Sequence, residues 1–216
     1  MKGSLVAIVT PMLANGEIDF NSFKKLLSFH ENEETNGIVL VGTTGESATL
    51  NKHERGEIFS FAKGESNLPL IAGVGSSSTN DAIDFIDIAQ KSGINDCLAV
   101  TPYYNKPSQK GLFLHFNELS KTSANIILYN VPGRTGVDLC PSTTEELSDI
   151  PNITGIKEAV DSSKRFEALK KIKSQRKDFL LYSGDDPTFV EFMRYGGDGV
   201  ISVAANVMPK QIRKLS

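Results

Sequence analysis

A lysine at the end of a short apolar segment is the residue of this sequence with the clearest potential for covalent chemistry. Residues 152–159 (NITGIKEA) are typical of a buried strand that ends at Lys157. A free lysine has a pKa near ~10.4, so attack on a carbonyl at neutral pH requires a pKa about 3 lower, which corresponds to roughly 4 kcal/mol. Burial at a strand end lowers a lysine pKa in this way. Because most lysines in such places are solvated surface groups, the other strand ends must decide the role of Lys157.

Hydroxyl groups and one arginine follow other predicted strands. Tyr129 ends the strand before that of Lys157, and a phenol near an amine can relay a proton to a bound carbonyl substrate. Thr43 and Thr44 lie in a Gly/Thr loop whose hydroxyls and backbone N–H groups suit a small carboxylate. Arg134 follows Tyr129 and suits a second carboxylate. Taken one at a time, Tyr129 is explained as a core residue, the Gly/Thr loop as a plain turn and Arg134 as a surface residue. Together with Lys157 they predict Schiff-base chemistry on a 2-oxo acid.

Metal and cofactor sites are not predicted. The three histidines fall in predicted helices, away from strand ends, and are expected on the surface: His30, His53 and His115. Asp185 and Asp186 are better explained as a helix start, with Asp186 as cap and Pro187 at the first position, than as cation ligands. These two carboxylates also disfavour a phosphate site, so sugar phosphates are not expected as substrates.

Eight apolar segments, each followed by a helical pattern, predict an α/β fold with an all-parallel sheet covered by helices. The segments are 5–9, 37–41, 70–74, 97–100, 126–129, 153–157, 180–183 and 199–203. Eight such units close most naturally as a (β/α)8 (TIM) barrel, whose active sites lie at the carboxyl ends of the strands. A doubly wound sheet is the alternative, but no GxGxxG dinucleotide motif is present.

Polar residues at the predicted helix starts support this division. Asp19 is a predicted cap for a helix that begins at residue 20, and Asn51 with Glu54 forms a predicted capping box. Ser142 with Glu145 predicts another capped start.

Composition limits the class of protein. The chain has 216 residues, a net charge of −3 and two cysteines, so we expect no nucleic-acid partner and no disulfide framework. Its first apolar run, residues 5–9, is too short to span a membrane, and we expect a cytoplasmic protein. One catalytic domain, 1–216, is expected to end in the eighth helix. Because such barrels typically have ~250 residues, truncation is also expected.

Four motifs resemble those of the 4-hydroxy-tetrahydrodipicolinate synthase family, also called dihydrodipicolinate synthase. They are GTTGES (42–47), TPYYNKP (101–107), YNVPGRTG (129–136) and GIKEA (155–159), and the similarity runs from Gly3 to about Pro209. The resemblance implies a lyase that condenses pyruvate with L-aspartate 4-semialdehyde, the entry step to diaminopimelate and lysine, without a cofactor. The family usually forms a homotetramer, a dimer of dimers, and continues with C-terminal helices beyond Ser216.

The resemblance also implies roles for individual residues. Lys157 matches the Schiff-base lysine. The proton-relay triad matches Tyr129, Thr43 and Tyr104, with Tyr104 reaching into the active site of a neighbouring subunit. Thr44 matches the contact to the pyruvate carboxylate, and Arg134 matches the residue that receives the semialdehyde carboxylate. Backbone positions near pyruvate match Gly184 and Ile201.

A lysine-feedback pocket is implied near Ser47, Ala48, Ser77, Asp81 and Tyr103. Lys52 and Ser77 stand where lysine-sensitive members often have histidine and asparagine, so weak feedback is expected.

Three alternatives remain at this point. Instead of the semialdehyde enzyme, the chain could be an N-acetylneuraminate lyase, a 2-keto-3-deoxy-sugar-acid aldolase, or a non-catalytic barrel subunit. Tyr104 and the segment Arg134-Thr135 favour the semialdehyde enzyme over the other two lyases.

Overall fold

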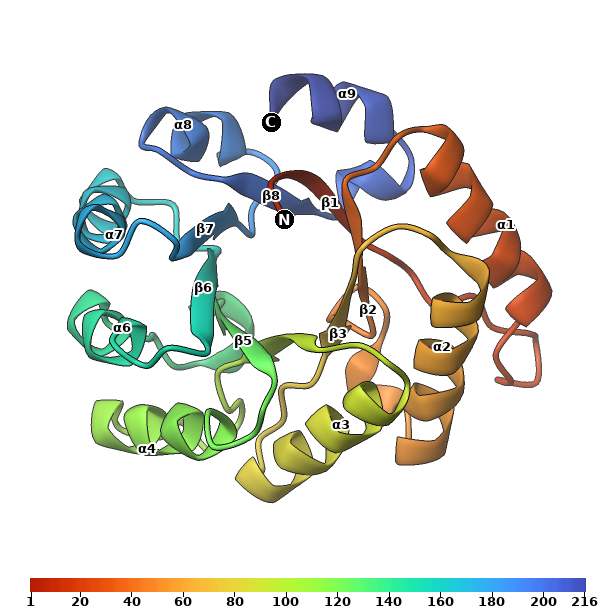
Figure 1. Cartoon of the computed structure of the whole chain (residues 1–216), viewed down its shortest axis with the longest axis horizontal. Helices are drawn as coiled ribbons and strands as arrows, with labels where there is room; N and C mark the ends of the chain where they lie inside the picture. The colour runs from red at the N-terminus through yellow and green to blue at the C-terminus, as the bar shows by residue number, and fades with distance from the viewer.

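Eight parallel strands close into one barrel in sequence order in the computed structural model, which describes residues 1–216 (Figure 1). The strands are β1 (Gly3–Ala7), β2 (Gly37–Leu40), β3 (Leu70–Gly73), β4 (Asp96–Val100), β5 (Asn125–Asn130), β6 (Ile153–Glu158), β7 (Leu180–Ser183) and β8 (Gly199–Ser202). Closure is completed by pairing of β8 with β1, where Ile201 lies opposite Leu5. The predicted (β/α)8 barrel is therefore confirmed, and the doubly wound alternative is excluded.

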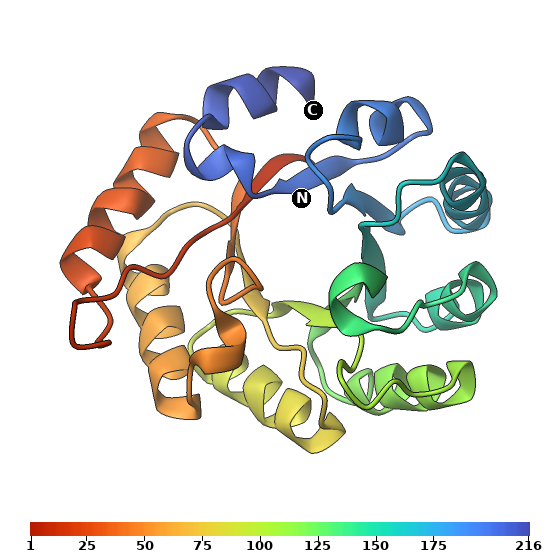
Figure 2. The same cartoon turned by 180° about the vertical axis from the view of Figure 1, so that it is seen from behind.

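Helices surround the barrel on its outside. They are α1 (Phe20–Asn32), α2 (Lys52–Glu65), α3 (Thr79–Lys91), α4 (Gln109–Leu119), α6 (Pro141–Ser148), α7 (Ser163–Gln175), α8 (Phe189–Arg194) and α9 (Pro209–Leu215). Three one-turn helices lie in loops that follow strands: η1 (Ser47–Thr49), α5 (Pro132–Thr135) and η2 (Ala204–Asn206). Figure 2 shows the molecule from behind, with the green turn after β5 facing the viewer at the barrel mouth. No helix combines the length and the apolar character needed to cross a membrane.

Two separate apolar cores explain why the strands read as continuous apolar runs. Successive side chains of a strand point to opposite faces, so each strand supplies both cores. The larger core comprises 41 buried residues, and helix residues such as Phe23 and Phe116 pack there against strand residues such as Ile38. The smaller core fills the barrel interior with Leu5, Ala7, Val39, Ile71, Leu98, Ile127, Tyr129, Tyr182 and Ile201. Functional groups on the inner face are thus held by close packing.

Two predicted helix starts are confirmed and one is wrong. The Asp19 side chain accepts a hydrogen bond from the Ser22 backbone, and Asn51 with Glu54 forms the complete capping box. Ser142 is not a cap, because α6 already begins at Pro141. A proline suits the first helical position, where its fixed φ matches the helix and no N–H is needed. The preceding residue, Cys140, makes no side-chain cap.

The predicted surface location is wrong for two of the three histidines. His30 is fully buried, with Nδ1 3.0 Å from Thr35 Oγ1, and His115 is 5% exposed, with Nδ1 2.9 Å from Thr79 Oγ1. Burial lowers the pKa of each to about 4, so both imidazoles are neutral at pH 7. Only His53 lies on the surface.

Candidate active site

Lys157 points into the barrel interior near the carboxyl end of β6. It lies in register between Tyr129 of β5 and Tyr182 of β7, and it is 5% exposed. Burial lowers its pKa to about 8; the charge of Arg134 acts in the same direction, and that of Asp186 opposes both. A lysine with this pKa supplies a useful fraction of neutral amine at physiological pH, as a carbonyl nucleophile requires.

The Lys157 side chain depends on a glycine in the neighbouring strand end. A Cβ at Gly184 would lie 3.0 Å from Lys157 Cε and 3.2 Å from Ala159 Cβ. A larger residue at Gly184 would require the Lys157 side chain to shift, so the glycine leaves it room. Ile201 is 1% exposed and belongs to the interior core that closes the barrel below the site. The structure thus brings Gly184 against Lys157 and places Ile201 in the same interior.

Tyr129 lies beside the amine. Its ring centroid is 4.2 Å from Lys157 Nζ. Burial raises the pKa of Tyr129, whereas the charge of Arg134 and a hydrogen bond with Thr43 lower it. The phenol is therefore protonated at neutral pH, and Tyr129 and Thr43 line the same small cavity. An amine, a phenol and a hydroxyl in this order can pass a proton to and from a bound carbonyl substrate.

Arg134 and Thr43 line one cavity at the barrel mouth. Its volume is about 200 Å³, and its lining residues are Thr43, Ser47, Ala48, Val100, Tyr103, Val131, Arg134 and Thr135. Arg134 is exposed and forms no ion pair within the chain, so its guanidinium is free to bind a carboxylate. Thr44, half-buried, does not line this cavity.

Tyr104 is not brought to Lys157 within one chain. It is 93% exposed and its φ is +72°, a left-handed conformation that is uncommon for a side chain with a Cβ. A large aromatic residue held outward in this way is available to a neighbouring molecule. Its role in a second subunit stays a prediction.

The sequence profile of the dihydrodipicolinate synthetase family matches residues 1–216, the whole chain. The chain belongs to this family. Among its relatives, the 4-hydroxy-tetrahydrodipicolinate synthase of Stutzerimonas stutzeri is 52% identical over 99% of this chain and 73% of its own length.

Solved structures of family members superpose closely. The chloride-inhibited dihydrodipicolinate synthase of Acinetobacter baumannii, complexed with pyruvate, has a TM-score of 0.94 and 45% identity over 99% of this chain and 74% of its own. A monomeric dihydrodipicolinate synthase variant has a TM-score of 0.95 and 40% identity over 99% and 73%. The barrel described above is therefore the dihydrodipicolinate synthetase fold.

In the loop that carries Thr43, the residues with a left-handed backbone conformation are not glycines. Val41 has φ +52° and Glu46 has φ +58°, whereas neither Gly42 nor Gly45 is left-handed. The left-handed residues expected of a plain turn are therefore present, but they are Val41 and Glu46 and not the glycines. Gly45 serves close approach instead, since a Cβ there would lie 3.0 Å from the carbonyl oxygen of Ile8. A left-handed valine costs about 1–3 kcal/mol and persists only where surrounding contacts hold it.

Arg55 of α2 supplies contacts of this kind. It is 3% exposed, and its guanidinium donates to the carbonyl oxygens of Ser47, Leu50 and Gly73. It also stacks on the ring of Phe85, with Cζ 3.9 Å from the ring centroid. One side chain therefore ties the loop of this family member to the end of β3.

We expect Arg55→Met to lower the free energy of unfolding by about 2–4 kcal/mol, because three carbonyl oxygens lose a buried donor. Urea denaturation measures the change. Arg194→Met, an α8 surface substitution with the same change of charge, should stay within about 0.5 kcal/mol of the original chain. Equal effects of the two substitutions would contradict the bracing role of Arg55.

The prediction that Asp186 caps a helix with Pro187 at its first position is wrong. Helix α8 begins at Phe189, and Thr188 precedes it. Asp186 Oδ2 instead accepts from the backbone N–H groups of Val203 and Ala204 at 3.0 and 2.9 Å, which joins the loops after β7 and β8. Its Oδ1 is buried without a hydrogen bond. The Asp186 carboxylate therefore binds the backbone N–H groups of the loop after β8 and does not bind those at the start of α8.

The residues of the implied feedback pocket occupy two neighbouring places. Ser47, Ala48 and Tyr103 line the cavity with Arg134. Ser77 accepts from Asn105 through its carbonyl, and Asp81 lies 3.4 Å from Lys52 Nζ. Weak lysine feedback stays a prediction for this family member.

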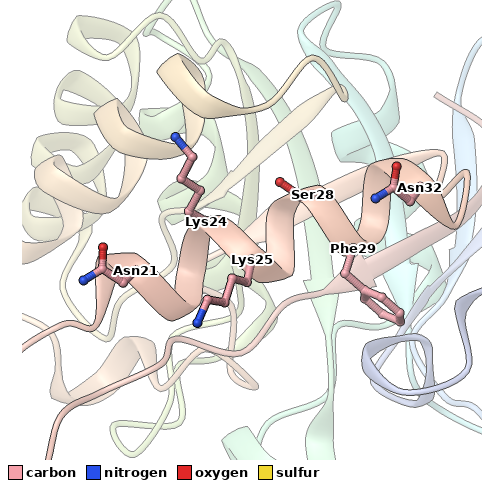
Figure 3. A pocket seen from close by; sticks show the side chains of 6 residues that line it. All are labelled: Asn21, Lys24, Lys25, Ser28, Phe29 and Asn32. Atoms are coloured by element: carbon pink, nitrogen blue, oxygen red, sulfur yellow. The ribbon is translucent and has the colours of Figure 1, made fainter.

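A large surface hollow is remote from this chemistry. It has a volume of about 790 Å³ and is lined by Asn21, Lys24, Lys25, Ser28, Phe29 and Asn32. Figure 3 shows that all six come from the outer helix α1, with Lys24 and Lys25 pointing to opposite sides. Lys24 is engaged by Glu65 at 2.7 Å. A hollow along one helix gives no convergent polar groups, so the active site remains at the barrel mouth.

Sequence reasoning missed the polar residues that support the site from behind. Asn130 and Glu158 are buried, directly after Tyr129 and Lys157. The alternation of strand side chains could have revealed them. Tyr129 and Lys157 point inward, so the residues that follow them, Asn130 and Glu158, point to the outer face.

Proposed function

We propose that this chain condenses pyruvate with L-aspartate 4-semialdehyde through a Schiff base at Lys157, the 4-hydroxy-tetrahydrodipicolinate synthase reaction. The observation that carries the proposal is the buried Lys157 amine, with a pKa of about 8, 4.2 Å from the ring of Tyr129. Family membership and relatives named for this reaction support it. Two carboxylate-binding groups, Thr44 and Arg134, suit two substrates that each carry a carboxylate.

The reaction begins when the neutral Lys157 amine attacks the keto carbon of pyruvate. Loss of water gives a protonated imine, which acts as an electron sink, so the adjacent methyl group releases a proton and becomes an enamine. The enamine carbon then bonds to the aldehyde carbon of the semialdehyde, whose oxygen takes up a proton. In this proposal Tyr129 and Thr43 move these protons and Arg134 holds the semialdehyde carboxylate, which the shared cavity of Thr43 and Arg134 supports.

Borohydride trapping with peptide mapping tests the proposal. Reduction in the presence of pyruvate should label Lys157 and no other residue. Turnover of L-aspartate 4-semialdehyde should then exceed cleavage of N-acetylneuraminate or 2-keto-3-deoxygluconate. Faster cleavage of either sugar acid would show that this sugar acid, and not the semialdehyde, is the substrate. No label at all would favour the non-catalytic barrel subunit.

We also propose that the chain acts as an oligomer, a homotetramer built from tight dimers, in which Tyr104 completes the relay of the neighbouring subunit. The exposure of Tyr104, 93%, supports this arrangement. Residues 1–216 form a single catalytic domain in this proposal. The proposed location is the cytoplasm, where Cys97 and Cys140 stay reduced.

Tyr104→Phe should lower kcat by about 10²-fold with little change in melting temperature, because the Tyr104 side chain is 93% exposed in its own chain. Mixing Tyr104→Phe chains with Lys157→Ala chains should restore roughly a quarter of the original activity. In a mixed dimer, the chain with an intact lysine receives Tyr104 from its neighbour. If the two chains exchange subunits and the mixture stays inactive, Tyr104 does not act across subunits.

A further inference from the structure

A buried polar cluster lies on the outer side of β5 and β6, behind Tyr129 and Lys157. We call it the Glu158 cluster; its members are Asn130, Asp138, Glu158 and Arg165. Asn130 and Glu158 directly follow Tyr129 and Lys157, so their side chains point away from the barrel interior. Asn130, Glu158 and Arg165 are 0%, 1% and 8% exposed.

Two carboxylates in this cluster share one guanidinium and one amide. Asn130 Nδ2 lies 3.0 and 3.2 Å from the two oxygens of Glu158 and 2.8 Å from Asp138 Oδ1. Arg165 of α7 forms an ion pair with Asp138, and its Nε is 3.8 Å from Glu158 Oε2. Burial raises the pKa of Glu158 to about 7, and Arg165 opposes this shift. The removal of one member leaves another buried polar group without its partner.

The cluster also grips the backbone just after the turn that carries Arg134. The Leu139 N–H donates to Asn130 Oδ1 at 2.9 Å, and Arg165 Nη1 donates to the Leu139 carbonyl oxygen at 2.7 Å. Together with the side chain of Asp138, these bonds fix residues 138 and 139 to β5 and α7. The chain between β5 and this anchor is only residues 131–137.

Outside the cluster, the Arg134 turn has one further side-chain support: Gln109 Nε2 of α4 donates to the Asp138 carbonyl oxygen at 2.6 Å. Helix α5 (Pro132–Thr135) is a single turn, too short to be stable on its own, and Gly136 ends it with φ +72°. Thr135 Oγ1 bonds only within the same segment, to the carbonyl oxygens of Val131 and Val137. The exposed Arg134 guanidinium has no partner that would hold it. Its position over the cavity is therefore set by the two ends of the turn.

We propose that Asp138 and Arg165 are positioning residues that hold the Arg134 turn over the barrel mouth and thereby set the affinity for the carboxylate of the second substrate. This inference rests on the proposed function, in which Arg134 receives that carboxylate. A role in stability alone explains the cluster less well, since a buried ion pair contributes little net stability compared with apolar residues of similar size. The ion pair does fix geometry, because Asp138 is bonded to Asn130 of β5 and to Arg165 of α7.

Asp138→Ala is the principal test, because this side chain is 41% exposed and its removal should not unfold the barrel. We expect the KM for L-aspartate 4-semialdehyde to rise about tenfold. The KM for pyruvate and the rate of the borohydride-trapped pyruvate adduct should stay within about twofold. Asp138→Asn, which keeps an oxygen acceptor for Asn130, should raise the semialdehyde KM less.

The matched control is Asp178→Ala. Asp178 also pairs with an arginine, Arg176, at 3.3 Å, but it lies before β7 at the opposite end of the barrel. Neither KM should change in this variant. A double-mutant cycle adds a second measurement: in an Arg134→Ala background, Asp138→Ala should have no further effect on the semialdehyde KM, because its effect passes through Arg134.

The outcomes separate this inference from the proposed function. If the unmodified chain forms no adduct at Lys157, the proposed function is wrong. If the adduct forms normally but Asp138→Ala leaves the semialdehyde KM unchanged, or raises both KM values equally, the positioning role is wrong. Additive effects in the double-mutant cycle would also overturn it. If Asp138→Ala fails to fold, an unchanged semialdehyde KM in Asp138→Asn overturns the proposal and a raised one supports it.

Discussion

Replacing Lys157 by methionine should abolish turnover and, at pH 7, make the folded chain more stable. The catalytic loss should be at least roughly a thousandfold, because Lys157 is the only buried lysine. The gain in stability follows from the pKa of Lys157, which burial lowers from 10.5 to about 8. This difference corresponds to about 3 kcal/mol against folding at pH 7, which an apolar side chain of similar length does not incur.

The sign of the pH dependence follows from the protons that each state binds. Between about pH 8 and 10.5 the unfolded chain keeps the Lys157 proton and the folded chain has lost it. The stability of the unmodified chain therefore rises with pH across this window, and the advantage of Lys157→Met should shrink there. At pH 7 only about one tenth of Lys157 is neutral, so kcat/KM should rise with pH towards 8.

Urea unfolding of both chains at pH 7 and pH 10, with turnover and borohydride labelling at each pH, measures these effects. Lys170→Met, on the exposed face of α7, is the control and should leave activity and the pH dependence of stability unchanged. Full activity of Lys157→Met, or labelling at another residue, would refute the Schiff-base assignment. Equal stabilisation by both substitutions would refute the energetic argument.

Tyr129→Phe should lower kcat by roughly 10²–10³-fold while the free energy of unfolding changes by about 1 kcal/mol or less. The ring that packs inside the barrel remains, and only the phenol hydroxyl is lost. Proton transfer to and from the bound substrate then lacks its relay, so formation of the pyruvate adduct should slow as well. Stopped-flow trapping with borohydride and steady-state turnover measure the two rates.

Tyr182→Phe is the matched control for this substitution. Tyr182 is also buried and lies in register with Lys157 on its other side, but its hydroxyl donates to the Met1 carbonyl oxygen at 2.7 Å. We expect a small loss of stability and no loss of kcat. A similar fall in kcat in both variants would mean that any interior phenol matters through packing, which would contradict a specific relay at Tyr129.

The local pattern of the sequence was sufficient to predict the architecture. The periods of apolar residues separate eight strands from the helices that follow them, and the capping box at Asn51 marks one of these helices. The position of Lys157 at the end of a strand was likewise predictable, but its burial was not, because most lysines at such places are solvated. These features depend on neighbours within a few residues along the chain.

Only the tertiary structure decided which polar groups meet. Asp186 bonds to backbone groups 17 and 18 residues away, and Arg165 reaches residues 26 and 27 positions before it. His30 was expected on the surface and is buried against Thr35. A side chain has several local partners of similar energy, and the closed barrel selects among them by bringing distant donors and acceptors together where water is excluded. Chain periodicity therefore determined the strands and the place of Lys157 at a strand end, whereas barrel closure determined its burial and the contacts that position the groups around it.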